Sequence, residues 1–511
     1  MSDWTAGYVA DIGYTYGYYA ELNPLRVKLA FLKAGLALPT TGTACELGFG
    51  QGVSANIHAA ASLTQWHGTD FNPSQAAFAQ DLAVASGANA HLVDDAFADF
   101  AQRPDLPEFD YIGVHGIWSW ISDENRAVMV DFIRRKLKVG GVLYISYNTL
   151  PGWASFAPMR HLLTQHAEVL GSDGNGIVSR IDGALDFASK LLQTNPAFAR
   201  ANPQVAERLQ RIQGQNRQYL AHEYFNRDWH PMHFATMAEW LAPAKVQFAC
   251  SANYFDYIDG INLSDEQQAL LDEIPDPLFR QSVRDFMVNQ QFRKDYWVKG
   301  ARQANQAEQA EALRQQRVLL ITPRDQVPLK VSGALGEAKM AEDVYVPILD
   351  LLADHKPKTL AQLEVALAAK DIRMSQLLEA VLVLIGAGNL VAMQDDEVTR
   401  KAKKQTDALN ARLMSLARSS SDITYLASPV IGGGMTVHRF EQLFLLARSQ
   451  GQKTPESWAQ LVWNALNAQG QKLIKEGKAL ESVEENLAEL TRQASDFAQH
   501  RLPILKALQI A

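Results

Sequence analysis

The sequence is poor in the features that mark secreted and membrane-spanning proteins. Its 511 residues include only two cysteines, Cys45 and Cys250, too few for a disulfide framework or a cysteine-rich zinc site. No apolar run approaches the roughly 18 residues of a transmembrane helix. The N-terminus also lacks the basic and then apolar pattern of a secretory signal. We therefore expect a cytoplasmic protein with two buried thiols and no membrane insertion.

Positive charge is also scarce. The formal net charge is −8, and the longest basic cluster is the short stretch 401–404. Because the neutralisation of phosphates dominates nucleic-acid binding, the sequence predicts no nucleic-acid partner. A hydrophobic content of 47% is ample for packed cores. The length predicts about three or four domains.

A glycine-rich turn is the most informative stretch. Residues 43–52 read Thr-Ala-Cys-Glu-Leu-Gly-Phe-Gly-Gln-Gly, which predicts a short strand and a tight turn, with a helix over 53–61. Glycines spaced by one residue let a ligand approach the backbone closely. The G-x-G-x-G spacing and the acid Glu46 argue against a pyrophosphate and favour a ligand with an ammonium or sulfonium charge. S-adenosylmethionine carries both charges.

A second acid follows at a characteristic distance. Asp70 ends the next predicted strand about twenty residues beyond the glycines, where a ribose-binding carboxylate belongs in a nucleotide-binding unit. An aspartate before Asn72-Pro73 also suits a helix cap. The spacing from the glycine turn favours ribose binding.

The pattern E-x-G-x-G-x-G resembles the first motif of the class I S-adenosylmethionine-dependent methyltransferases. The resemblance implies that Asp95, after the third strand, accepts a hydrogen bond from the adenine amino group, and that S-adenosylhomocysteine is the product. The residues predicted to bind the cofactor are Glu46, Gly48, Gly50, Gly52, Asp70, Phe71, Asp95, Ala96, Phe97 and His115.

Strand and helix patterns alternate regularly up to residue 146. Strands are expected at 90–93, 109–114 and 142–146, in a parallel sheet with right-handed crossovers. A polar helical stretch then interrupts the pattern, and strands at 245–250 and 292–298 would close the sheet. The expected fold class is α/β, with a Rossmann-like, seven-stranded class I methyltransferase sheet that carries a helical insertion. A winged-helix-like module and a helical C-terminal domain follow.

The expected segments have these boundaries: 1–153 for the methyltransferase core with the cofactor site, 154–228 for the helical insertion, 229–300 for the completion of the sheet and the regulatory region, 317–395 for the winged-helix-like module, and 396–511 for the C-terminal domain. The presumptive recognition helix of the winged module, 375–385, has no basic residue, so protein contact is favoured over DNA. The stretch 425–434 is expected to be a loop that contacts the catalytic domain or a partner chain.

Aromatic residues cluster where an acceptor would enter. Five tyrosines lie between residues 8 and 19, and they suit either an arm packed on the first helix or a lid over the cofactor. The stretch 115–120, which contains His115, Trp118 and Trp120, follows the fourth strand at the edge of the sheet where ligands bind. The two tryptophans are consistent with packing in the wall of the site as well as with substrate contact. His115 is either a general base or a structural hydrogen-bond donor. The predicted channel residues are Tyr14, Tyr16, His115, Trp118, Tyr147 and Asn148.

The stretch 219–233 is dense in histidine, glutamate, tyrosine and asparagine. His222 and Glu223 suggest a metal, but the H-x-x-x-H spacing is missing and the ligands are too few. We expect no metal site and favour a segment that caps the substrate entrance.

Three further stretches, 147–153, 222–226 and 284–293, resemble the bacterial methyltransferases that carry a methyltransferase regulatory domain. These are similar to the protein lysine methyltransferases that rickettsiae use on outer-membrane proteins. The resemblance implies a protein acceptor, methylated at lysine by direct in-line transfer, and a homodimer. The alternatives are a small-molecule or glycan O- or N-methyltransferase and a non-catalytic scaffold that binds S-adenosylmethionine.

Overall fold

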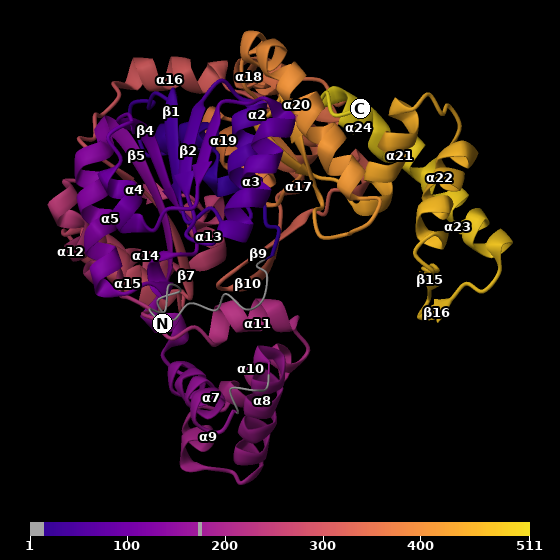
Figure 1. The fold of residues 1–511 in the computed structure, drawn as a ribbon. Helices are drawn as coiled ribbons and strands as arrows, with labels where there is room; N and C mark the ends of the chain where they lie inside the picture. The colour runs from indigo at the N-terminus through magenta and orange to yellow at the C-terminus, as the bar shows by residue number, and fades with distance from the viewer. Residues whose placement is uncertain (1–14, 172–175) are drawn as a thin grey trace.

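The computed structural model describes residues 15–171 and 176–511. Figure 1 shows a central sheet flanked by helices, a helical segment that projects below it, and C-terminal helices that extend to the right. Tyr14 lies outside the described residues.

Seven strands form the central sheet in the order β3-β2-β1-β4-β5-β7-β6. The first five are parallel, and β7 runs antiparallel to both of its neighbours. The strands are β1 (Thr43–Leu47), β2 (Gln65–Thr69), β3 (Ala90–Val93), β4 (Phe109–Val114), β5 (Leu137–Asn148), β6 (Gln247–Ser251) and β7 (Phe292–Val298). The predicted seven-stranded sheet is confirmed, including its closure by two strands that follow the insertion.

The sheet helices begin and end at local sequence signals. The side chain of Asn72 accepts a hydrogen bond from the Ser74 N–H before α3, and Gly87 ends that helix at a φ of 63°. Ser122 caps α5 in the same way through the Asn125 N–H. The helices of this part are α1 (Val27–Lys33), α2 (Val53–Ala61), α3 (Pro73–Ser86), α4 (Phe97–Gln102), α5 (Asp123–Lys136) and α12 (Phe234–Leu241).

The helical insertion has a hydrophobic core of its own, which includes Phe156, Leu163, Ile181 and Leu209. It projects from the lower end of the sheet in Figure 1. The pairs Asn195-Pro196 and Asn202-Pro203 separate neighbouring helices of the insertion, since proline is disfavoured inside a helix. Its helices are α6 (Leu150–Trp153), α7 (Ala157–Val169), α8 (Ile177–Gln193), α9 (Ala197–Ala201), α10 (Gln204–Gln213) and α11 (Arg217–Tyr224).

A buried charge network joins the returning chain to the sheet. Three short helices precede β7: α13 (Asp259–Asn262), α14 (Asp265–Asp272) and α15 (Pro277–Met287). Arg293 on β7 donates to Asp285 of α15 at 2.6 Å and to Asp295 at 2.9 Å. The Tyr147 hydroxyl donates to Asp295 at 3.0 Å. Tyr147, predicted to line the channel, is instead buried in this network behind the site.

The winged-helix-like module consists of three helices and a three-stranded sheet in the order β11-β8-β12. Strand β8, which precedes the three helices, lies at its centre. Helix α19 has a buried residue at nearly every position from Leu377 to Ile385, so it has no free recognition face. The elements of the module are β8 (Arg317–Leu320), α17 (Glu342–Leu352), β11 (Lys358–Thr359), α18 (Leu360–Leu367), α19 (Met374–Gly386) and β12 (Leu390–Ala392). Helix α16 (Gln306–Gln315) precedes the module, and β9 (Lys330–Gly333) and β10 (Gly336–Lys339) form a separate two-stranded sheet between β8 and α17.

The C-terminal region is helical apart from short strands. The stretch predicted as a loop at 425–434 falls within a hairpin, in which β13 pairs antiparallel with β14 around a turn at Pro429–Gly432. Its glycines permit both the turn and close packing. The elements are α20 (Asp396–Leu416), β13 (Tyr425–Ser428), β14 (Gly433–Thr436), α21 (Arg439–Ser449), α22 (Pro455–Asn467), β15 (Ile474–Lys475), β16 (Lys478–Ala479), α23 (Val483–Asp496) and α24 (Leu502–Ala507).

This hairpin contacts the catalytic part at the segment before α1. The Asn23 amide donates to the carbonyls of Ile431 and Gly432. A Cβ at Gly434 would lie 2.9 Å from the Tyr18 ring, so the glycine allows that close approach. The predicted contact with the catalytic domain is confirmed, and it holds the residues next to Tyr19.

Candidate active site

The glycine turn after β1 adopts a backbone that favours glycine. Gly48, Gly50 and Gly52 have φ values of 74°, 58° and 68°. A Cβ at Gly48 would lie 2.6 Å from Ile117, and one at Gly52 would lie 2.4 Å from the Cβ of Ala79. Gly48 and Gly50 line a cavity, whereas Gly52 lets α2 pack on α3.

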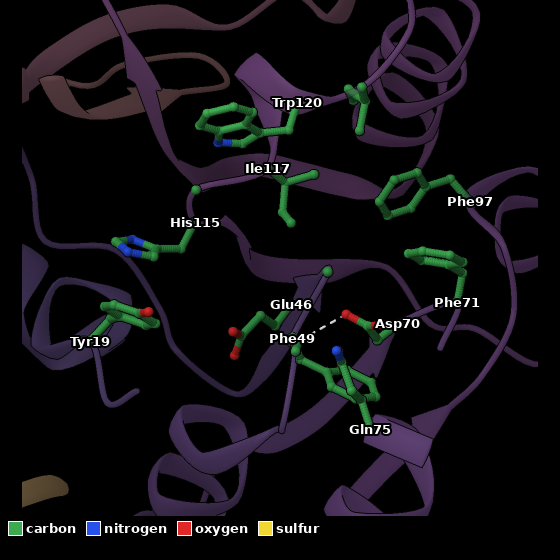
Figure 2. A pocket seen from close by; sticks show the side chains of 14 residues that line it. Tyr19, Glu46, Phe49, Asp70, Phe71, Gln75, Phe97, His115, Ile117 and Trp120 are labelled. Atoms are coloured by element: carbon green, nitrogen blue, oxygen red, sulfur yellow. Dashed lines mark hydrogen bonds between the residues drawn. The ribbon is translucent and has the colours of Figure 1, made fainter. Parts of the chain in front are cut away.

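This first cavity lies at the carboxyl ends of β1, β2 and β4. Figure 2 shows Phe71 and Phe97 at one end, Tyr19 and His115 at the other, and the carboxylate Glu46 between them. Its lining residues are Tyr19, Glu46, Gly48, Phe49, Gly50, Asp70, Phe71, Gln75, Phe97, His115, Gly116, Ile117, Trp120 and Ile121. The structure thus brings together most of the predicted cofactor residues.

Asp70 connects the turns that follow β1 and β2. Its carboxylate accepts the Gly50 N–H at 2.8 Å, drawn in Figure 2, and the Asn72 N–H at 3.1 Å. Burial raises the pKa of Asp70 to about 6, and the two backbone N–H groups oppose that rise. Each oxygen keeps a second lone pair, which suits a pair of adjacent hydroxyl groups.

Glu46 is a buried acid with an unsatisfied oxygen. Its side chain is 3% exposed, and Oε2 has no hydrogen-bond partner among the described residues. Burial raises the pKa of Glu46 to about 8, and the negative charge of Asp70 adds to the rise. A buried carboxyl beside a cavity is stabilised by a cationic ligand, because the ligand replaces the lost hydration. The site therefore fits the amino group of S-adenosylmethionine.

The predicted adenine partners are only partly brought together. Phe71 and Phe97 line the cavity and give it an apolar end. Asp95 instead pairs with Arg103 at 3.0 Å, and Ala96 is an exposed residue before α4. Asp95 and Ala96 lie outside the cavity lining.

A second cavity of about 490 Å³ lies between the strand ends and helices α10 and α11 of the insertion. Four residues line both cavities: Tyr19, His115, Gly116 and Trp120. The remaining lining residues of the second cavity are Thr15, Asn148, Trp153, Arg208, Arg211, Ile212, Gln215, Tyr219, Glu223, Tyr224, Gln291 and Phe292. A group bound in one cavity therefore borders a group bound in the other.

His115 forms part of this shared wall. Its ring stacks on Tyr19 with centroids 3.8 Å apart, and its Nδ1 lies 2.8 Å from the Tyr144 hydroxyl. Burial lowers the pKa of His115 to about 3, so the imidazole is neutral near pH 7. We infer that His115 orders the wall, since Nδ1 is already engaged.

The other predicted channel residues divide between the cavity and the core. Asn148 lines the second cavity, and its side-chain oxygen accepts the Trp153 indole N–H at 3.1 Å. Tyr16 packs on Phe78, with ring centroids 5.1 Å apart, and is not in the cavity lining. Trp118 is fully buried against Met232 and Trp240.

Sequence reasoning missed several lining residues. Tyr19 stood among five tyrosines with no pattern to distinguish it, and Trp120 was as consistent with packing as with substrate contact. Arg208 and Arg211 come from the insertion, and no periodic signal links them to the sheet. Glu223 also lines the second cavity, and it belongs to the stretch 219–233 that was predicted to cap the substrate entrance.

Two features are absent from residues 15–171 and 176–511. No helix there combines the length and apolar character needed to cross a bilayer. That part of the chain also lacks a group of three or more His, Cys, Asp or Glu side chains that could hold a metal ion.

Comparison with known proteins agrees with the fold. PKMT2 of Rickettsia typhi, solved in complex with AdoHcy, superposes with a TM-score of 0.69 at 16% identity, covering 97% of this chain and 99% of that one. A second structure of PKMT2 from the same organism gives 0.67 at 17% identity, covering 98% and 99%. The strand order and the glycine turn define this fold as that of the class I methyltransferases.

Family membership follows from the sequence comparisons. The model of a predicted methyltransferase regulatory domain matches residues 216–299. An uncharacterized protein of Synechocystis is 41% identical over 513 residues, covering 99% of this chain and 100% of that protein. The chain belongs to the same family as this Synechocystis protein, and it carries a predicted methyltransferase regulatory domain on a class I methyltransferase fold.

Proposed function

We propose that this protein transfers the methyl group of S-adenosylmethionine to the ε-amino group of lysine in a protein acceptor. The observation that carries the proposal is the wall shared by the two cavities, formed by Tyr19, His115, Gly116 and Trp120. A donor in the first cavity and an acceptor in the second would meet there. Holding two reactants in line supplies much of the rate enhancement in such a transfer.

The first cavity has groups for each part of the donor. Glu46 suits the cationic amino group, Asp70 the ribose hydroxyls, and Phe71 with Phe97 the adenine ring. S-adenosylmethionine, when bound, supplies the methyl group on a positively charged sulfur. The chain's own residues hold and orient it and exclude water.

The second cavity supports an amine acceptor. Lysine has an ordinary pKa of about 10.4, and its amine must lose a proton before it attacks. Aromatic walls such as Tyr219, Tyr224 and Trp153 lower that pKa by desolvation, and their ring faces attract cations. The rickettsial resemblance also favours a protein acceptor and a homodimer.

An acceptor screen tests the proposed function. Purified protein and methyl-labelled S-adenosylmethionine are incubated with a lysate of cells that lack the enzyme, and products are identified by mass spectrometry. We expect mono-, di- or trimethyl-lysine in one or a few proteins, and no label with the Asp70→Asn variant. Label confined to small molecules or glycans would contradict the lysine assignment. Tight cofactor binding without any methylated product would indicate a scaffold.

Cofactor affinity should depend on pH through Glu46. A cationic amino group binds the ionised carboxylate, but in the ligand-free protein the Glu46 pKa of about 8 keeps it mostly protonated at pH 6. Affinity should therefore rise on the order of tenfold between about pH 6.0 and 7.5. In Glu46→Gln it should be weaker and nearly flat over that window, as measured by calorimetry.

The stability of the ligand-free protein should depend on pH in the opposite direction to its cofactor affinity. Because the folded pKa of Glu46 lies above its ordinary value of 4.5, the folded state binds more protons than the unfolded state between these values. The Glu46 contribution therefore lowers stability as pH rises from about 4.5 to 8, and Glu46→Gln should remove that loss. Identical pH profiles for parent and variant would contradict this account of Glu46.

A further inference from the structure

Glu223 is an acid in an unfavourable place. It lies in the last turn of α11, where the negative end of the helix dipole disfavours a carboxylate. It makes no hydrogen bond or ion pair with any residue that the structure describes. Burial raises its pKa to about 7. Nothing in the surrounding packing therefore accounts for a glutamate at this position.

The surroundings of Glu223 suit a cation. It lines the second cavity with Tyr219 and Tyr224, and Trp153 lies close to Tyr224, with ring centroids 6.0 Å apart. Aromatic faces together with one carboxylate form the type of site that binds alkylammonium groups. The same cavity ends at the shared wall, where the methyl group would be presented.

Two arginines on α10 line the same cavity. Arg208 lies over the Trp153 ring, with Cζ 3.8 Å from its centroid, and Arg211 is exposed. Neither forms an ion pair with another described residue. Their positive charges repel an ammonium group, so within this cavity the attractive position is at Glu223.

We propose that Glu223 binds the ammonium group of the acceptor lysine and accepts its proton before methyl transfer. This inference rests on the proposed function and adds the residue that selects and activates the acceptor. One N–H bond breaks, and its proton passes to the carboxylate. The nitrogen lone pair then forms the N–CH₃ bond as the S–CH₃ bond breaks, and the sulfur keeps that electron pair.

Glutamine at this position keeps the shape and removes the charge. We expect Glu223→Gln to lower kcat/KM for the acceptor by about 100-fold or more, the usual contribution of general base catalysis. Cofactor affinity should stay within twofold by calorimetry. The parent activity should rise with pH through about 7, since ionisation of Glu223 is required, and this limb should be lost in the variant.

The other titratable and charged groups that line the second cavity determine how the pH dependence of activity is interpreted. They are Tyr219 and Tyr224 on its own helix, Arg208 and Arg211 on α10, and Tyr19 and His115 in the shared wall. Tyr219 has a pKa raised to about 12 by burial and by Glu223 itself, and the pKa of His115 is about 3. Neither titrates near pH 7, and saturating S-adenosylmethionine removes the pH dependence that arises from Glu46. At saturating cofactor, a limb near pH 7 therefore reports Glu223.

Glu207→Gln is the matched control, because Glu207 is exposed on α10 and does not line the cavity. Thermal unfolding at pH 8 distinguishes the proposed role of Glu223 from a purely structural one. At that pH, removal of the unpaired charge should leave the Glu223→Gln variant as stable as the parent or more stable. A variant that unfolds more easily than the parent at that pH would overturn the proposal.

A binding assay separates this inference from the proposed function. N-acetyl-lysine N-methylamide is titrated into parent and Glu223→Gln protein saturated with S-adenosylhomocysteine, and NMR line broadening is followed. We expect binding to the parent that is at least tenfold weaker in the variant, and none with the Nε-acetylated probe. Equal binding, or normal methylation by Glu223→Gln, would refute the role of Glu223. Glu223-dependent binding without methylation would refute only the proposed function.

Discussion

S-adenosylmethionine should bind the Asp70→Asn variant about 100-fold more weakly than the parent, a loss of about 3 kcal/mol. The carboxylate accepts the N–H groups of Gly50 and Asn72, at 2.8 and 3.1 Å, and so holds two turns of the first cavity in register. An asparagine has one acceptor oxygen and turns its amide N–H₂ toward either a backbone N–H or a ribose hydroxyl. The variant therefore loses both an acceptor for one of these hydrogen bonds and the negative charge of the carboxylate.

Calorimetry on the folded variant measures this effect directly. Asp99→Asn is the control, because Asp99 is exposed on α4 and does not line the cavity. It should bind the cofactor as the parent does. If Asp70→Asn retained parental affinity while folding normally, the assignment of the first cavity to the cofactor would be wrong.

Replacement of Arg293 by methionine should lower the free energy of unfolding by about 3–5 kcal/mol. The change leaves Asp285 and Asp295 buried without their counter-charge, and both are 1% exposed. Burial already raises the pKa of Asp285 to about 6 despite the arginine. The network joins α15 to β5 through Tyr147, so we also expect reduced activity.

Urea unfolding provides the measurement, and Arg302→Met provides the control. Arg302 is exposed soon after β7, and its replacement should stay within about 0.5 kcal/mol of the parent. The free energy of unfolding of Arg293→Lys should lie between those of the parent and Arg293→Met, because lysine keeps the charge but lacks the planar guanidinium that binds two carboxylates. A variant Arg293→Met with unchanged stability would show that the network is energetically neutral.

Local signals predicted much of the sheet. Helix α2 and strands β3, β4 and β7 have their expected bounds, because the glycine turn marks the start of the helix and a short run of strand-forming residues marks each strand. Strand β5 begins five residues before its predicted start. Its residues 137–141 contain two glycines and resemble a helix end, and they become extended by pairing with β4 and the chain beyond β7.

The site was predictable mainly where its residues lie at or soon after the end of a sheet strand. Glu46, Gly48, Gly50, Asp70 and Phe71 lie at the ends of β1 and β2, and Phe97 and His115 follow β3 and β4. By contrast, the neighbour of Asp95 is Arg103, and the neighbours of Tyr16 are set by tertiary packing. Glu223 was noticed as a weak metal candidate, and only the folded insertion shows that it lines the same cavity as His115.

The hairpin of β13 and β14 affects when the enzyme can become active during its synthesis. Ribosomes deliver every strand of the seven-stranded sheet by residue 298, yet the hairpin contacts of Tyr18 and Asn23 form only after residues 431–434 emerge. The support that the hairpin gives to the segment next to Tyr19 is therefore added late. A nascent chain can complete its Rossmann core well before this support of its catalytic wall is in place.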